Sequence, residues 1–299
     1  MERKPGIDAF GAAALVAIAC LFAVNQVVIK LTNGGFQPVF LAALRSGLAV
    51  VCVLAWLRLR GLPLGLRRAD LGAGLLTGGL FAAEFLCLFV ALDHTTVARS
   101  SVIFYSMPVW LALAAHLLLP GERLTPRRSA GLGLAFAGVA WAILDRQGAG
   151  GEASLLGDLL ALGAALGWGG VALAVRLSRV SSLRPETQLL WQVLVSAPLL
   201  LAAAPFFGPF LRDPGPMHLA GLVFQTVAVV SFGFAAWFWL LARYPASGVA
   251  SFSFLTPVIG VALGWGLLGE HVSASVISAL VLVAAGLVLI NRPGRKQTG

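Results

Sequence analysis

Two side chains in this sequence carry a full charge in the middle of long apolar stretches. Arg45 lies in an apolar run that begins near residue 38, and Glu84 lies in another that ends near residue 92. A charge at the centre of a membrane-spanning helix costs about 2.5–3.5 kcal/mol on insertion scales, so neither side chain is expected to face lipid. Each lies about eight residues, or roughly 12 Å, from the same end of the predicted bundle. The two charges are therefore predicted at the same depth.

Three roles are open for this pair. Arg45 and Glu84 could form a buried ion pair that locks the two stretches together, which would make Arg45 a structural residue. Glu84 could instead face an internal cavity, where it would hold a substrate amine or a proton. It could also face that cavity as part of a hydrogen-bond network, with a carboxyl group that does not change its protonation state. In the last two cases Glu84 is a substrate-site residue.

Aromatic side chains within the apolar stretches are further candidates for a binding site. Trp168 and Trp237 lie deep in their stretches and are expected either to form cavity walls or to pack against lipid and neighbouring helices. Tyr105 lies three residues before Pro108. A buried phenol needs a hydrogen-bond partner, and the proline frees a backbone carbonyl one turn back. Tyr105 is thus expected to cap that carbonyl or to contact substrate.

Uncharged polar side chains within the stretches complete the candidate site. Asn25 and Gln192 lie mid-stretch, and Ser253 precedes Pro257. Such groups often join helices, at about 0.6–2 kcal/mol each, but two or three of these polar groups are expected to line a pathway. No HExxH, GxSxG or phosphate-binding loop occurs in the sequence. The sequence therefore predicts no enzyme, no metal and no cofactor.

The composition requires membrane helices to position these residues. Of 299 residues, 59% are hydrophobic and 11% are charged, against about 25% charged in soluble domains. Crossing a bilayer takes about 20 apolar residues, and the apolar runs do not alternate at period two, as barrel strands would. The fold class predicted is all-α, a polytopic membrane protein with ten transmembrane helices. The predicted spans are 10–31, 38–57, 70–92, 98–119, 128–145, 154–176, 186–207, 217–242, 246–268 and 272–291.

The basic residues predict the orientation of these spans. Of 21 Lys and Arg residues, 16 lie in segments on the N-terminal side of the membrane and 4 on the other side. Because basic residues are retained in the cytoplasm, both termini are predicted cytoplasmic. The formal net charge of +9 is then explained by topology. No basic run with interleaved aromatics predicts nucleic-acid binding, and the expected partners are membrane lipid and a small molecule.

The chain repeats itself after about 148 residues. Phe104-Tyr105-Ser106-Met107-Pro108 matches Ser253-Phe254-Leu255-Thr256-Pro257, and Glu122 and Glu270 follow the two prolines at similar distances. Five spans per repeat place the halves upside down relative to one another, with 1–147 as the first and 148–299 as the second. Inverted repeats are typical of transporters, whose substrate sites lie at the repeat interface beside interrupted helices. Pro108 and Pro257 are structural candidates for such interruptions.

These features resemble the EamA-type members of the drug/metabolite transporter superfamily. The resemblance rests on ten spans, two five-helix repeats, and small-residue segments leading to Pro108 and Pro257, with Gly121-Glu122 and Gly269-Glu270 beyond them. It covers essentially the whole chain and implies the fold more specifically than the substrate.

Within that family, three segments look most like bacterial amino-acid exporters that prefer aromatic and other apolar side chains. They are Glu84 with its flanking aromatics, Trp168, and Ala235-Ala236-Trp237. Met107 stands where such an exporter would carry a tryptophan, which makes it a candidate substrate contact by position. The resemblance implies alternating-access export of small metabolites across the bacterial inner membrane. A channel-like or uncoupled facilitator, or an exporter of other metabolites or drugs, is the alternative.

Overall fold

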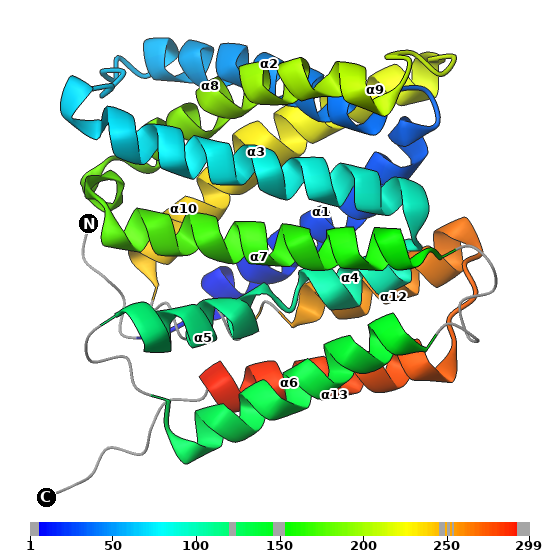
Figure 1. The fold of residues 1–299 in the computed structure, drawn as a ribbon. Helices are drawn as coiled ribbons and strands as arrows, with labels where there is room; N and C mark the ends of the chain where they lie inside the picture. The colour runs from blue at the N-terminus through cyan, green and yellow to red at the C-terminus, as the bar shows by residue number, and fades with distance from the viewer. Residues whose placement is uncertain are drawn as a thin grey trace, which may run out of the picture.

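The protein is an all-helical bundle (Figure 1). The computed structural model describes residues 6–119, 124–145, 153–244, 249, 252 and 254–291. The α-helices are α1 (Ala9–Asn33), α2 (Pro38–Leu59), α3 (Leu71–His94), α4 (Val97–Phe104), α5 (Met107–Leu118), α6 (Pro126–Leu144), α7 (Leu155–Leu177), α8 (Pro185–Ala203), α9 (Pro216–Phe224), α10 (Phe234–Arg243), α12 (Leu255–Leu268) and α13 (Ala274–Asn291).

Short helical segments extend or join several of these helices. Three are 3₁₀ turns, namely η1 (Arg68–Asp70), η3 (Arg179–Ser182) and η4 (Ala204–Phe207), and η5 (Gln225–Gly233) is a π-helix that joins α9 to α10. Within the described residues, seven spans are long and apolar enough to cross a membrane, and α12 and α13 form two shorter apolar helices. With α6, and with α4–α5 and α9–η5–α10 each forming one span, the predicted ten spans are confirmed.

Helix starts follow ordinary capping chemistry. The side chains of Asp8, Thr96, Thr125 and Ser154 each accept a hydrogen bond from a backbone amide in the first turn of α1, α4, α6 and α7. A side-chain acceptor at this position satisfies one of the amides that the helix leaves unpaired. The cap fixes where each span begins, and so it fixes the depth of the residues that follow.

One membrane span is broken near its middle. The span predicted at 98–119 divides into α4 and α5 at Tyr105 and Ser106, and α5 begins with Met107 and Pro108. A proline is tolerated at a helix start because the amide it lacks would be unpaired there anyway. The predicted interruption at Pro108 is thus present. In the other half, α12 begins at Leu255, two residues before Pro257.

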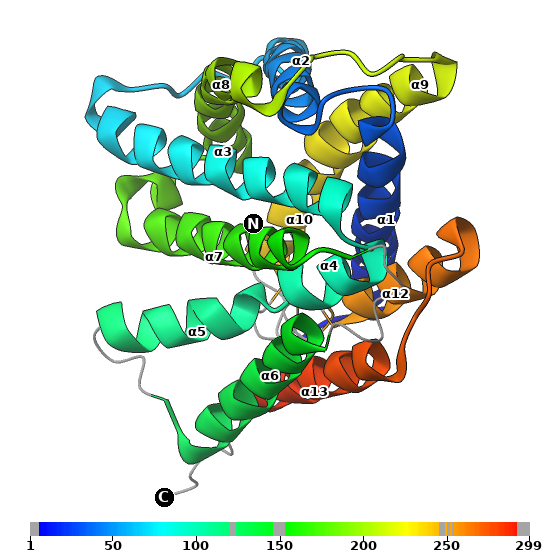
Figure 2. The ribbon, with the colours of Figure 1, turned by 45° about the vertical axis from the view of Figure 1, so that its right-hand side comes forward.

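Corresponding helices of the two halves pack against each other. At one side of the bundle α2 lies next to α8, and at the opposite side α6 lies next to α13 (Figure 1 and Figure 2). α4 packs against α12 between these layers. The break between α4 and α5 and the start of α12 therefore lie inside the bundle, between the two halves.

The contact between α6 and α13 depends on glycine. A Cβ atom added to Gly131 would lie 2.8 Å from the carbonyl oxygen of Gly286, whereas one added to Gly133, two residues along the same helix, would meet nothing within 4 Å. Small residues of this kind let membrane helices approach closely.

We therefore expect Gly131→Val to destabilise the protein by about 1–3 kcal/mol, because the added methyl groups force the two backbones apart. Gly133→Val is the matched control and should stay within about 1 kcal/mol of the wild type. Thermal unfolding of the detergent-solubilised protein measures both variants, and equal losses would contradict the glycine contact.

The two ends of the bundle are called the Arg99 end and the Tyr244 end. The Arg99 end is where α1 and α3 finish, at Asn33 and His94; there the Asn33 side-chain amide donates to the Phe89 carbonyl at 2.9 Å. The Tyr244 end is where α1 begins and α10 finishes.

Candidate functional site

A pocket lies between the two halves of the chain beside the broken span. It is lined by Leu15, Ile18, Ala19, Phe22, Tyr105, Trp168, Trp237, Phe252 and Thr256. Its cavity volume is about 20 Å³, which is room for about one water molecule. The pocket thus joins helices of both repeats, and it has to widen before it can hold a small organic molecule.

The three aromatic site candidates come together in this pocket. Trp168 of α7 stacks on Phe104 with ring centroids 5.1 Å apart, and its ring meets Tyr105 edge-on at 5.9 Å. Trp237 of α10 packs against Phe22 of α1 at 6.4 Å. Trp168 and Trp237 therefore line the cavity and are not purely lipid-facing residues. Offset and edge-on ring pairs each contribute about 0.5–1.5 kcal/mol beyond their buried area, which favours a defined shape for this wall.

Tyr105 sits at the break between α4 and α5 and is only 5% exposed. One turn before it, the Ser101 hydroxyl donates a hydrogen bond of 2.9 Å to Gln26 Oε1 of α1. Next to Gln26, the Asn25 side chain is buried, and its Oδ1 has no hydrogen-bond partner. The Ser101–Gln26 bond therefore joins α1 to α4 in the turn before the break in the span.

Glu84 lies close behind this pocket, although it does not line it. The carboxylate belongs to α3 and is 3% exposed, and its Oε2 has no hydrogen-bond partner. Here α3 meets α7 so closely that a Cβ on Gly167 would lie 3.0 Å from the Cα of Glu84. Gly167 precedes Trp168, so Glu84 packs against α7 next to a residue that lines the pocket.

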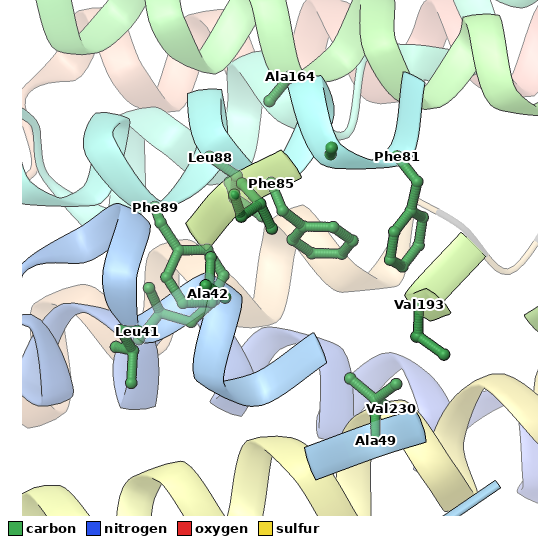
Figure 3. Close-up of a cluster of buried hydrophobic side chains, with 14 of the residues drawn as sticks. Leu41, Ala42, Ala49, Phe81, Phe85, Leu88, Phe89, Ala164, Val193 and Val230 are labelled. Atoms are coloured by element: carbon green, nitrogen blue, oxygen red, sulfur yellow. The ribbon is translucent and has the colours of Figure 1, made fainter. Parts of the chain in front are cut away.

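Arg45 extends from α2 toward α3 but does not pair with Glu84 of that helix. Its guanidinium carbon lies 3.8 Å from the centre of the Phe85 ring and 4.9 Å from that of Phe89. The side chain is fully buried, and Nε, Nη1 and Nη2 all lack a hydrogen-bond partner. Figure 3 shows Phe85 and Phe89 extending from α3 toward α2. Within the described structure the two charges interact at long range and form no ion pair, so the first of the three roles does not describe this conformation.

The remaining site candidates lie elsewhere or outside the described residues. Met107 packs at the edge of the main hydrophobic cluster, where it faces Gly169 of α7. Gln192 is buried in α8 and does not line the pocket. Ser253 lies outside the described residues, although its neighbours Phe252 and Thr256 do line the pocket.

A buried ion pair that was not predicted from the sequence lies at the Arg99 end. Arg99 of α4 is 1% exposed and Asp158 of α7 is fully buried; Arg99 Nη2 lies 2.7 Å from Asp158 Oδ2. Arg99 also donates to the backbone carbonyls of Ala142 and Asp145, and Thr95 donates to Asp158 at 2.7 Å. Arg99 and Asp158 lie near span ends in the sequence and in the structure, so neither was predicted as a charge well inside a span.

A second buried carboxylate at the Arg99 end holds the start of α4. Glu270 is 3% exposed and accepts hydrogen bonds from the amides of Val97 and Ala98 at 2.7 and 2.9 Å. Lys30 of α1 lies 3.8 Å from the same carboxylate and donates to the Thr95 carbonyl at 2.7 Å. This cluster ties α1 and the Gly269-Glu270 segment to the start of the broken span.

The Tyr244 end carries a contact that corresponds to the Thr95–Asp158 bond. Tyr244 follows α10 as Thr95 follows α3, and its hydroxyl donates to Asp8, the N-cap of α1, at 2.7 Å. In both cases a glycine three residues after a helix N-cap leaves room for the contact. These are Gly11 after Asp8 in α1 and Gly157 after Ser154 in α7. A Cβ on Gly11 would lie 2.6 Å from the Tyr244 ring, and one on Gly157 would lie 2.8 Å from Thr95 Cβ. The repeated spacing from N-cap to glycine is a signal in the sequence that could have found both contacts.

Comparison with known proteins agrees with this two-part architecture. Residues 9–144 and 155–292 each match the EamA-like transporter family. The chain is 28% identical over 297 residues to a protein of Escherichia coli named "Probable amino-acid metabolite efflux pump", covering 97% of this chain and 95% of that one. It is 30% identical over 212 residues to the uncharacterized transporter YvbV of Bacillus subtilis, covering 70% and 67%.

A solved crystal structure shares the fold. It superposes with a TM-score of 0.66 at 23% identity and covers 93% of this chain and 96% of its own. The two family matches, the ten spans and the pocket between the halves lead to one assignment: this multi-pass membrane protein is a transporter and not an enzyme, and it belongs to the EamA-like transporter family.

Proposed function

We propose that this protein exports amino acids with aromatic or other apolar side chains across the bacterial inner membrane. Both termini would lie in the cytoplasm, with the Arg99 end outside, and the halves would divide at residues 147 and 148. The observation that carries the proposal is the pocket in which Tyr105, Trp168 and Trp237 come together. Aromatic walls with few polar groups suit an apolar side chain. The named efflux function of the Escherichia coli relative supports amino-acid export.

Transport would proceed by alternating access around this pocket. The corresponding contacts Thr95–Asp158 and Asp8–Tyr244 join helices at opposite ends of the bundle. Because the halves are inverted copies, opening one end while the other stays closed reproduces the same motion on the opposite side. The pocket of about 20 Å³ is then a closed form that widens when either end opens.

Cells that overproduce the protein test the export of amino acids directly. We expect phenylalanine, leucine or similar amino acids to accumulate in the medium and intracellular pools to fall, relative to cells with an empty vector. In proteoliposomes, an unlabelled amino acid inside should drive saturable counterflow of labelled amino acid, because a carrier exchanges its substrates. Accumulation of non-amino-acid compounds alone, or flux without counterflow, would contradict the proposal.

Removing one aromatic wall should weaken transport. We expect Trp168→Ala to raise the half-saturation concentration for phenylalanine counterflow about tenfold, equivalent to about 1.4 kcal/mol of lost contact. Trp141→Ala is the control, because Trp141 is 49% exposed on the outside of the bundle and should leave transport unchanged. Similar losses in both variants would argue against the pocket as the binding site.

A further inference from the structure

Arg45 has hydrogen-bonding capacity that nothing in the described structure uses. A guanidinium group carries five N–H donors in a planar fork. The rings of Phe85 and Phe89 interact with its face, at 3.8 and 4.9 Å, whereas Nε, Nη1 and Nη2 have no partner. Contact with aromatic rings does not satisfy donors at the edge of the plane. An acceptor with two oxygens would fit that edge.

Glu84 is the complementary group on the neighbouring helix. Its Oε2 is buried and has no partner, and it interacts with Arg45 at long range without forming an ion pair. If the two residues served only to hold α2 and α3 together, direct pairing would satisfy both groups at once. The described structure instead leaves the Arg45 donors and one Glu84 carboxylate oxygen unpaired on two neighbouring helices.

The surroundings of Arg45 connect both halves of the chain. Arg45 shares a face of α2 with Leu41 and Ala49, which are four residues away on either side. That face enters the cluster that contains Phe85, Val193 of α8 and Val230 of η5 (Figure 3). The π-helix η5 packs against α2, and π-helical turns occur frequently at functional sites. Arg45 therefore lies at the repeat interface, where a transporter places its substrate.

We propose that Arg45 and Glu84 together recognise a zwitterion. The Arg45 guanidinium binds the substrate carboxylate through two parallel hydrogen bonds, and Glu84 binds the ammonium group. The apolar side chain of the substrate then extends toward Trp168 and Tyr105, which line the pocket. This inference rests on the proposed function. In it Arg45 determines specificity and is not only a structural residue. Together, Arg45 and Glu84 select α-amino acids over amines and over carboxylic acids.

Substrate analogues test the two charges separately. In proteoliposomes, phenylalanine, phenylalaninamide and 3-phenylpropanoate compete against counterflow of labelled phenylalanine. For the wild type we expect each analogue to compete at least about tenfold more weakly than phenylalanine, because each leaves one buried charge unpaired. Arg45→Gln should remove the preference for phenylalanine over its amide and keep the discrimination against 3-phenylpropanoate. Glu84→Gln should do the reverse.

Control variants separate this assignment from a structural effect. Ser46 is a buried neighbour of Arg45 whose hydroxyl also lacks a partner, and Ser46→Ala should preserve both ratios. If Arg45→Gln does not fold, Arg45→Lys and the wild-type analogue series still decide the matter. Unchanged ratios in Arg45→Gln, or a wild type that accepts the amide equally, would overturn the zwitterion site. Absence of any amino-acid counterflow in the wild type would instead contradict the proposed function.

Discussion

Asp158→Asn is expected to destabilise the protein by about 3–5 kcal/mol, because it leaves the Arg99 guanidinium buried without a counter-charge. Arg99 is 1% exposed, so water cannot replace the lost carboxylate. The amide of asparagine would accept one hydrogen bond but would carry no charge. Chemical denaturation in detergent, with helix content as the signal, measures the loss.

A second ion pair at the same end of the bundle provides the control. Asp93 and Arg212 lie 2.8 Å apart, as close as Arg99 and Asp158, but their side chains are 20% and 38% exposed. Solvated ion pairs of this kind contribute about 0–1 kcal/mol, so Asp93→Asn should have a small effect. Equal effects of the two variants would show that burial does not govern the Arg99 site.

A double variant separates the attraction within the pair from the cost of an orphaned charge. Arg99→Met combined with Asp158→Leu removes both charges and keeps similar volumes. We expect it to be more stable than Asp158→Asn alone, since no buried charge remains unpaired. A double variant as unstable as the sum of both single variants would contradict this view.

The helices of this fold could be predicted from the sequence, because each follows from a local rule. An apolar run long enough to cross a bilayer has to form a helix that satisfies its own backbone. Capping residues such as Ser154 and prolines such as Pro108 mark where helices start. The position of Glu84 within a span likewise predicted its burial, because the cost of exposing a charge to lipid is large.

The rotation of each helix about its axis could not be predicted in the same way. Most spans are apolar on all sides, so no polar face shows which residues meet. For this reason the sequence left open whether Arg45 pairs with Glu84, whereas the structure places the guanidinium on the rings of Phe85 and Phe89. Trp168 and Tyr105 were both candidates, but only packing shows that their rings meet at 5.9 Å.

Buried charges at span ends were not predicted from the sequence. Arg99 and Asp158 lie near predicted boundaries, where a charge ordinarily contacts water and lipid headgroups. In the structure Arg99 lies in the broken half-helix α4, which is entirely buried, and the start of α7 packs over it. The ends of a short buried half-helix lie within the protein. A charged residue at such an end is therefore buried, although its position in the sequence is that of a span boundary.

Glu270→Ala should show how strongly such a buried end depends on its carboxylate. The variant leaves the amides of Val97 and Ala98 without their acceptor, and it removes the charge that lies 3.8 Å from Lys30. Hydrogen bonds to a charged group contribute about 1.5–3 kcal/mol each. Allowing for relaxation of the freed amides, we expect a loss of about 3 kcal/mol in unfolding free energy.

Two comparisons decide whether that loss arises from capping the buried half-helix. Glu270→Gln keeps an acceptor oxygen and should recover about half of the loss. Glu186 lies in the first turn of α8 and is partly exposed, so Glu186→Ala should cost only about 0.3–1 kcal/mol, as for an exposed acid near a helix dipole. If Glu270→Ala were as mild as Glu186→Ala, the carboxylate would be dispensable for holding α4. The start of that half-helix would then be held by its other contacts, such as the Thr96 cap, the hydrogen bond from Lys30 to the Thr95 carbonyl and packing against α12.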